Sequence, residues 1–141
     1  LHKEYRRQRQ MCIRDRSLRW IKDIVKSAPP NLPIILYAKA SNNRLELLAN
    51  TGVQCLSLDH EVDLFKSRCI LPKEISLQGN LNPKILESNP QQVVMETRKL
   101  LTEMNGDSGH ILNLGHGIRP TARIDCMEAL VATNQSFQRN N

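Results

Sequence analysis

The feature that most constrains this chain is the regular alternation of short apolar runs with segments of helical periodicity. Four apolar runs of strand length are each followed by a segment whose apolar residues recur every three or four positions. Such alternation predicts a parallel sheet with right-handed crossovers. The predicted strands are residues 34–38, 53–58, 74–77 and 110–114, and the helices that follow them are 42–50, 61–67, 90–104 and 124–137.

Local signals place several of the helix ends. A further helix over residues 17–27 is expected to end at Ala28, because the residue before a proline is pushed out of the helical region. Gly52 closes helix 42–50, and Asn89 is the expected N-cap of helix 90–104. Strand 34–38 is apolar throughout, so we expect it to be covered on both faces. The residues of the last helix expected to face inward are Met127, Leu130, Val131 and Phe137.

Length limits how much of such an architecture the chain can form. A complete eight-stranded α/β barrel needs roughly 250 residues, whereas this chain has 141. We therefore predict an α/β fold, a partial TIM (β/α)8 barrel of about four C-terminal βα units with a parallel sheet, over residues 17–141. An open sheet of this kind has two unpaired edges and uncovered apolar faces, so we expect it to be poorly stable or to associate.

The positive charge of the chain is concentrated at its N-terminus. The formal net charge is +6, and residues 1–16 hold six lysines and arginines against two acids. Residues 11–16 resemble a scar found in mis-assembled gene sequences, so we interpret residues 1–16 as a basic leader that is non-native or disordered. The alternative is a basic arm that attracts phosphate non-specifically.

Cysteine spacing and hydropathy exclude several other classes of protein. Cys12, Cys55, Cys69 and Cys126 form no C-x-x-C pair and have no histidine at zinc-ligand spacing, so we predict free thiols and no metal site. No stretch approaches the roughly 18 apolar residues that a membrane-spanning helix needs. We therefore expect a cytoplasmic protein that binds neither membrane nor nucleic acid.

The candidate functional residues follow the predicted strands, because ligands of parallel sheets bind beyond the carboxyl ends of the strands. Lys39 is interpreted as a solvated or paired charge, and Asp59 is expected to cap the next helix or to pair with a lysine or arginine. Gln78, Gly79 and Asn80 offer amide groups and a close backbone approach to a ligand, although turn chemistry explains them nearly as well.

His116 is the sharpest of these signals. It lies at a strand end between Gly115 and Gly117, which leave the imidazole unhindered and permit backbone dihedrals that other residues avoid. Such a loop could wrap around an anionic ligand with its N–H groups exposed. An imidazole can donate a hydrogen bond, relay a proton or, when charged, hold a carboxylate. We therefore predict that His116 is a ligand-binding residue, whereas His60 and His110 carry no such signal.

Three segments together carry a family resemblance. They are Leu58-Asp59, the run Leu77-Gln78-Gly79-Asn80-Leu81-Asn82-Pro83, and the segment from Gly109 through His116 to Ile118. In order and spacing they resemble the C-terminal half of uroporphyrinogen decarboxylase, over about residues 17–137. Two positions depart from that family: His60 stands where a tryptophan is usual, and Asn82 stands where an aspartate is usual.

The resemblance implies a cofactor-free carboxy-lyase of haem biosynthesis. Such an enzyme converts the four acetate side chains of uroporphyrinogen III to methyl groups, giving coproporphyrinogen III, in a homodimer of distorted barrels. The family's arginine-rich loop, its pyrrole-binding aspartate and its substrate-binding tyrosine and serine belong to the N-terminal half. Only the substrate-binding histidine maps onto this chain, at His116, with residues 78–80, Gly115 and Gly117 as the supporting loops. The catalytic acid and base therefore stay unassigned, and the chain alone is expected to be inactive.

Two alternatives come from other classes. A corrinoid-dependent methyltransferase of the same superfamily would share the barrel, but its expected zinc-binding His-x-Cys pair does not occur in this sequence. A basic nucleic-acid-binding module would retain its salt-dependent binding in a chain that starts at Ser17.

Overall fold

The computed structural model describes residues 17–39 and 43–138. Residues 17–27 form a helix, and the chain leaves it at Ala28 as predicted. Residues 1–16, which we interpret as a basic leader, lie outside the described residues. So does residue 42, the first of the predicted helix 42–50.

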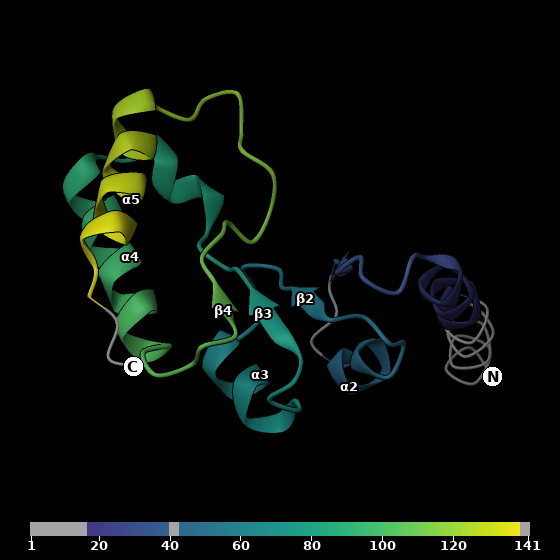
Figure 1. Cartoon of the computed structure of the whole chain (residues 1–141). Coiled ribbons are helices and arrows are strands. Elements are labelled where there is room, and N and C mark those ends of the chain that lie inside the picture. The colour runs from purple at the N-terminus through teal and green to yellow at the C-terminus, as the bar shows by residue number, and fades with distance from the viewer. Residues whose placement is uncertain (1–16, 40–42, 139–141) are drawn as a thin grey trace, which may run out of the picture.

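Four short strands form one parallel sheet, which confirms the predicted fold class. They are β1 (Ile35–Tyr37), β2 (Cys55–Ser57), β3 (Ser76–Gln78) and β4 (His110–Ile111), and they lie side by side in sequence order (Figure 1). All three pairings are parallel, with Leu36 opposite Leu56, Leu56 opposite Leu77 and Leu77 opposite His110. Sequential parallel strands with a helical connection after each are the architecture of a partial (β/α)8 barrel.

The helices follow the strands, and their caps explain where they begin. They are α2 (Leu45–Ala49), α3 (Leu64–Ile70), α4 (Pro90–Glu103) and α5 (Ile124–Ser136). In α4 the Asn89 side chain accepts a hydrogen bond from the Gln92 amide at 2.9 Å, as predicted. In α3 the cap is Asp63, which accepts from the Lys66 amide, so this helix begins three residues later than the periodicity indicated.

A short 3-10 helix between β3 and α4 was missed by the sequence analysis. It is η1 (Pro83–Glu87), and the Asn82 side chain caps it by accepting a hydrogen bond from the Lys84 amide at 3.0 Å. Because a cap needs an acceptor oxygen rather than a charge, asparagine can fill this position as well as aspartate.

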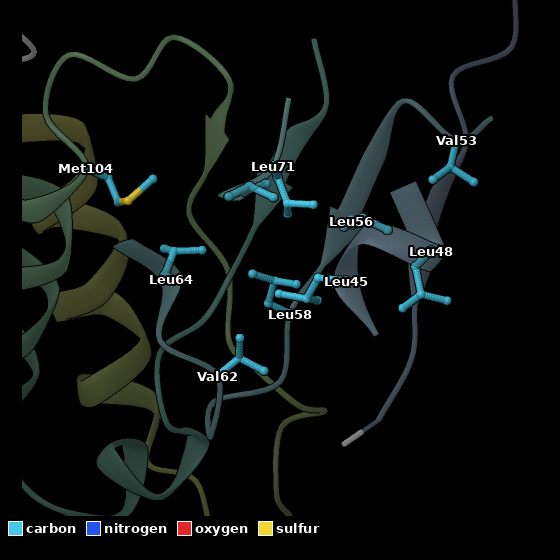
Figure 2. Packing of buried hydrophobic residues seen from close by; sticks show 10 residues of the cluster. Leu45, Leu48, Val53, Leu56, Leu58, Val62, Leu64, Leu71 and Met104 are labelled. Atoms are coloured by element: carbon cyan, nitrogen blue, oxygen red, sulfur yellow. The ribbon is translucent and has the colours of Figure 1, made fainter. Parts of the chain in front are cut away.

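The main core lies between the sheet and the helices α2 and α3. Leu56, Leu58 and Leu77 point from the strands to this side and are almost fully buried. Figure 2 shows Leu58 and Leu45 of α2 near the centre of the cluster, with Leu64 and Met104 at one end. This cluster fixes which face of the sheet the helices cover.

A second, smaller core joins α4, α5 and η1. Cys126, Val93 and Leu86 are fully buried in it, and α4 runs beside α5 (Figure 1). Met127 and Leu130 pack against this core as predicted. Val131 is 47% exposed, so its predicted inward position is wrong, because the buried stripe of α5 runs through Cys126 and Thr133 instead.

The other face of the sheet is exposed along its two edge strands, which corrects the expectation for residues 34–38. Ile35 and Tyr37 are 49% and 43% exposed, and Ile111 at the opposite edge of the sheet is also exposed. On this inner face Cys55 and Ser57 of the central strand β2 are buried, whereas Ile35 and Tyr37 are not, so only the Leu36 side of β1 packs against the main core. Association through this face stays a prediction.

Replacing Leu77 with alanine should lower the free energy of unfolding by about 2–5 kcal/mol, because Leu77 is fully buried and its loss leaves a cavity in the main core. Leu32→Ala is the matched control, since Leu32 is 55% exposed and its loss should change the stability by about 0.5 kcal/mol or less. Urea unfolding followed by the fluorescence of Trp20 measures both; equal effects would show that Leu77 is not a core residue.

Candidate functional site

An open pocket of about 370 Å³ lies beyond the carboxyl ends of the strands. Tyr37 and Ser57 supply one wall from β1 and β2, and Met127 and Leu130 supply another from α5. The rest comes from the segment after β4, which crosses toward α5 in Figure 1. Its lining residues are Leu112, Asn113, Leu114, His116, Gly117 and Ile118. The volume lies within the range of small-molecule sites, about 300–1,000 Å³.

The structure places His116 on the wall of this pocket with its side chain exposed. The segment just before it is held by the strand exit of β3. Leu81 and Leu114 form a parallel bridge, and the Gly115 amide donates a hydrogen bond to the Leu81 carbonyl at 2.8 Å. The start of the His116 loop is therefore fixed by backbone pairing.

The far end of the same loop is held by η1. The Glu87 carboxylate accepts a hydrogen bond from the Thr121 hydroxyl and lies 3.3 Å from the Arg119 Nε. The Arg123 amide donates to the Leu86 carbonyl at 2.8 Å. His116, Gly117 and Ile118 are thus the apex of a loop that is anchored on both sides.

The glycines beside His116 have a different structural role from the one predicted from the sequence. Gly115 and Gly117 are not among the glycines with positive φ, so neither is needed for an unusual backbone conformation. Gly115 is needed for close packing, because a Cβ there would lie 2.6 Å from the His60 Cα and closer still to the His60 nitrogen. Gly117 has no atom within 4 Å of its Cβ position, so the imidazole is unhindered on that side.

The predicted supporting residues after β3 shape the fold around the site and do not line the pocket as described. Gly79, with φ of 135°, lets the chain pass 3.1 Å from the Leu58 carbonyl oxygen, measured from the Cβ position. The buried Asn80 side chain donates from Nδ2 to the carbonyls of Asp59, at 2.9 Å, and Val62. Gln78 is half-buried at the end of β3.

Asp59 holds a buried cluster at the exit of β2. Its carboxylate is 2% exposed, accepts from the Glu61 amide at 3.2 Å and lies 2.9 Å from the His60 Nδ1. The Tyr37 hydroxyl donates to it at 3.5 Å. Asp59 therefore neither caps α3 nor pairs with a lysine or arginine, because Asp63 already fills the cap position. Burial, together with the charge of Asp59, raises the pKa of the Tyr37 phenol.

Lys39 is exposed at the end of β1.

His110 has a structural role that the sequence did not indicate. It is 4% exposed, and its Nε2 lies 2.9 Å from the Gly79 carbonyl oxygen. This contact ties β4 to the exit of β3. A histidine that opens a strand gives no sequence signal for such a contact, because its partner lies 31 positions away along the chain.

Residues 17–39 and 43–138 contain neither a cluster of metal ligands nor a membrane-spanning helix. No group of three His, Cys, Asp or Glu side chains in these ranges lies close enough to hold a metal ion. Cys55, Cys69 and Cys126 are free thiols, and burial raises the pKa of Cys55. Over the same residues no helix is both long and apolar enough to cross a bilayer.

Replacing Gly115 with alanine should displace the His116 loop, because the new methyl group meets His60 backbone atoms that cannot rotate away. We expect a loss of about 1–3 kcal/mol in the free energy of unfolding. Gly117→Ala is the matched control and should change little, since its Cβ position is open. Urea unfolding of both variants tests this; a neutral Gly115→Ala would rule out the close contact.

Comparison with known proteins gives a consistent assignment. The sequence profile of the uroporphyrinogen decarboxylase (URO-D) family matches residues 12–137, so the match begins inside the basic segment 1–16. Uroporphyrinogen decarboxylase of Vesicomyosocius okutanii is 35% identical over 82% of this chain and 33% of its own length. Uroporphyrinogen decarboxylase 2, chloroplastic, of Arabidopsis thaliana is 42% identical over 72% of this chain and 26% of its own length.

The fold also matches a solved structure, a methyltransferase from Methanosarcina mazei, with a TM-score of 0.72 over 84% of this chain and 34% of that one. At 21% identity this likeness shows the fold alone. The chain spans about one third of the length of the curated relatives it matches. With the family profile covering nearly all of its described residues, the chain belongs to the uroporphyrinogen decarboxylase family.

Proposed function

We propose that this chain forms part of a uroporphyrinogen decarboxylase, and that His116 contacts a carboxylate of the porphyrinogen substrate. The observation that carries the proposal is the position of His116, onto which the resemblance maps the family's substrate-binding histidine, at the wall of a pocket beyond the strand ends. The reaction would convert uroporphyrinogen III to coproporphyrinogen III by loss of four CO₂ molecules, without a cofactor.

The chemistry explains what the chain must supply. Loss of CO₂ from an acetate arm leaves an electron pair, which a pyrrole ring protonated at an α-carbon can accept. The enzyme must therefore deliver protons and hold several carboxylates. A surface imidazole suits the second task, because it donates a hydrogen bond when neutral and forms a charged pair when protonated. The exposed loop apex lets the substrate reach it.

The remaining groups would come from the part of the enzyme that this chain does not include. The relatives are about three times as long as the matched segment, so the proton donor and the arginine-rich loop are assigned to that part. We further propose that the complete enzyme is a homodimer in the cytoplasm. The sheet's open inner face would then form the interior of the closed barrel.

The methyltransferase alternative is less well supported. The structural neighbour from Methanosarcina mazei shares the fold at 21% identity, whereas the decarboxylase relatives reach 35–42%. The sequence has no His-x-Cys pair for the zinc site of a corrinoid-dependent methyltransferase.

The 141-residue chain alone should form no detectable coproporphyrinogen from uroporphyrinogen, because it supplies only one of the family's substrate-binding groups. A chimera in which residues 17–137 replace the matched segment of the Vesicomyosocius okutanii relative should be active. Chromatography of the oxidised porphyrin products measures both. Product formation by the isolated chain would contradict the proposal that the remaining substrate-binding and catalytic groups lie in the other part of the enzyme. An inactive but folded chimera would contradict the proposed function.

In the active chimera, His116→Ala should lower kcat/KM about 10- to 100-fold, the effect expected from loss of one hydrogen bond to a charged group. The thermal midpoint should change little, since His116 is exposed. His116→Gln keeps a hydrogen-bond donor and should retain more activity than the alanine variant. Lys99→Ala, an exposed position on α4, is the control. An unchanged kcat/KM for His116→Ala would show that His116 does not contact the substrate.

A further inference from the structure

Tyr37 is the aromatic side chain in the lining of the pocket, and it comes from the strand farthest from His116. It lies opposite Ser57 in the β1–β2 pairing, on the open inner face of the sheet, and 43% of its surface is exposed. A single exposed aromatic ring is not unusual by itself. This ring, however, forms part of a concave site, where exposed aromatic surface is available to a ligand.

The tip of the Tyr37 side chain is fixed by a residue that does not line the pocket. Asp59 is buried, and one of its carboxylate oxygens receives the Tyr37 hydroxyl at 3.5 Å. Its other oxygen accepts from the Glu61 amide and lies beside the His60 ring. A buried carboxylate needs such partners, and the Tyr37 hydroxyl, at 3.5 Å, is the most distant of the three.

This arrangement decides which part of Tyr37 a ligand meets. A tyrosine phenol is protonated at neutral pH, and the burial and the charge of Asp59 that raise the pKa of Tyr37 favour the same form. The hydroxyl lies toward Asp59, and the ring is the apolar part of the side chain in the pocket lining. The pocket therefore combines an imidazole at His116 with an aromatic surface at Tyr37.

We propose that Tyr37 contacts a pyrrole ring or apolar arm of the substrate, and that Asp59 is the positioning residue that holds the Tyr37 ring in the pocket. The proposal rests on the proposed function, because a substrate that carries both carboxylates and pyrrole rings matches the two kinds of wall. His116 takes the carboxylate, and Tyr37 packs against the ring system.

The contact with Asp59 can be tested in the 141-residue chain without substrate. The chain has two tyrosines, so Tyr5→Phe leaves Tyr37 as the one phenol whose absorbance is titrated. We expect its pKa to fall in urea and to fall in Asp59→Asn, which removes the neighbouring charge. Asp63→Asn is the control, because Asp63 pairs with Lys66. The comparison with Asp59→Asn carries the test of Asp59, because loss of burial alone also lowers the pKa of Tyr37 in urea. A pKa equal in the folded and the unfolded chain would overturn the positioning role.

The substrate contact is tested in the active chimera. Tyr37→Leu should raise KM up to about ten-fold with kcat little changed, because the loss is one aromatic contact. Tyr37→Phe keeps the ring and should raise KM less, whereas Asp59→Asn frees the ring and should raise KM. Ile35→Leu, on the same sheet face but outside the pocket lining, is the control.

The outcomes separate the two proposals. An inactive chimera overturns the proposed function, and the substrate role of Tyr37 falls with it. An active chimera in which Tyr37→Leu leaves KM unchanged overturns this inference alone.

Discussion

The structure depends on the contacts that the exits of β3 and β4 make with the exit of β2. Gly79 passes close to the Leu58 carbonyl, the Asn80 amide donates to the Asp59 carbonyl, and Gly115 packs on the backbone of His60. These are contacts with backbone atoms, which cannot adjust by rotating a side chain. They bring three strand exits to fixed spacings and so set where the His116 loop begins.

That fixed base explains how an exposed loop can still present a defined group. The His116 loop leaves the sheet through the Leu81–Leu114 bridge and returns through the contacts of Glu87 and Leu86 with residues 119–123. Its apex lies on the pocket wall, while Tyr37, whose hydroxyl lies 3.5 Å from the Asp59 carboxylate, lines another wall. One short segment after β2 therefore supports both walls, through the Asp59 side chain and the His60 backbone. The ion pair of Glu87 with Arg119 lies at the surface, where such pairs contribute little to stability.

Several features could be predicted because their causes are local. The four βα units, the Asn89 cap and the strand-end position of His116 follow from periodicity and capping chemistry in neighbouring residues. Other features depend on partners far along the chain. The cluster of Asp59 with Tyr37, the contact of His110 with Gly79 and the packing reason for Gly115 join residues 22 or more positions apart. Two misses were local: α3 begins later than its periodicity indicated, at the cap Asp63, and η1 is a short 3-10 helix with too few residues to show a period.

The sequence by itself determined the alternation of strands and helices, the parallel sheet that follows from it, and the family motif around His116. It could do so because hydrophobic period, caps and motifs are written in residues that are neighbours along the chain. Only the tertiary structure decided which face of the sheet is covered, which side of α5 is buried, and why Asp59 and Gly115 occupy their positions. Those outcomes depend on which elements pack together in space, and an apolar strand carries the same pattern whether one face or both are covered.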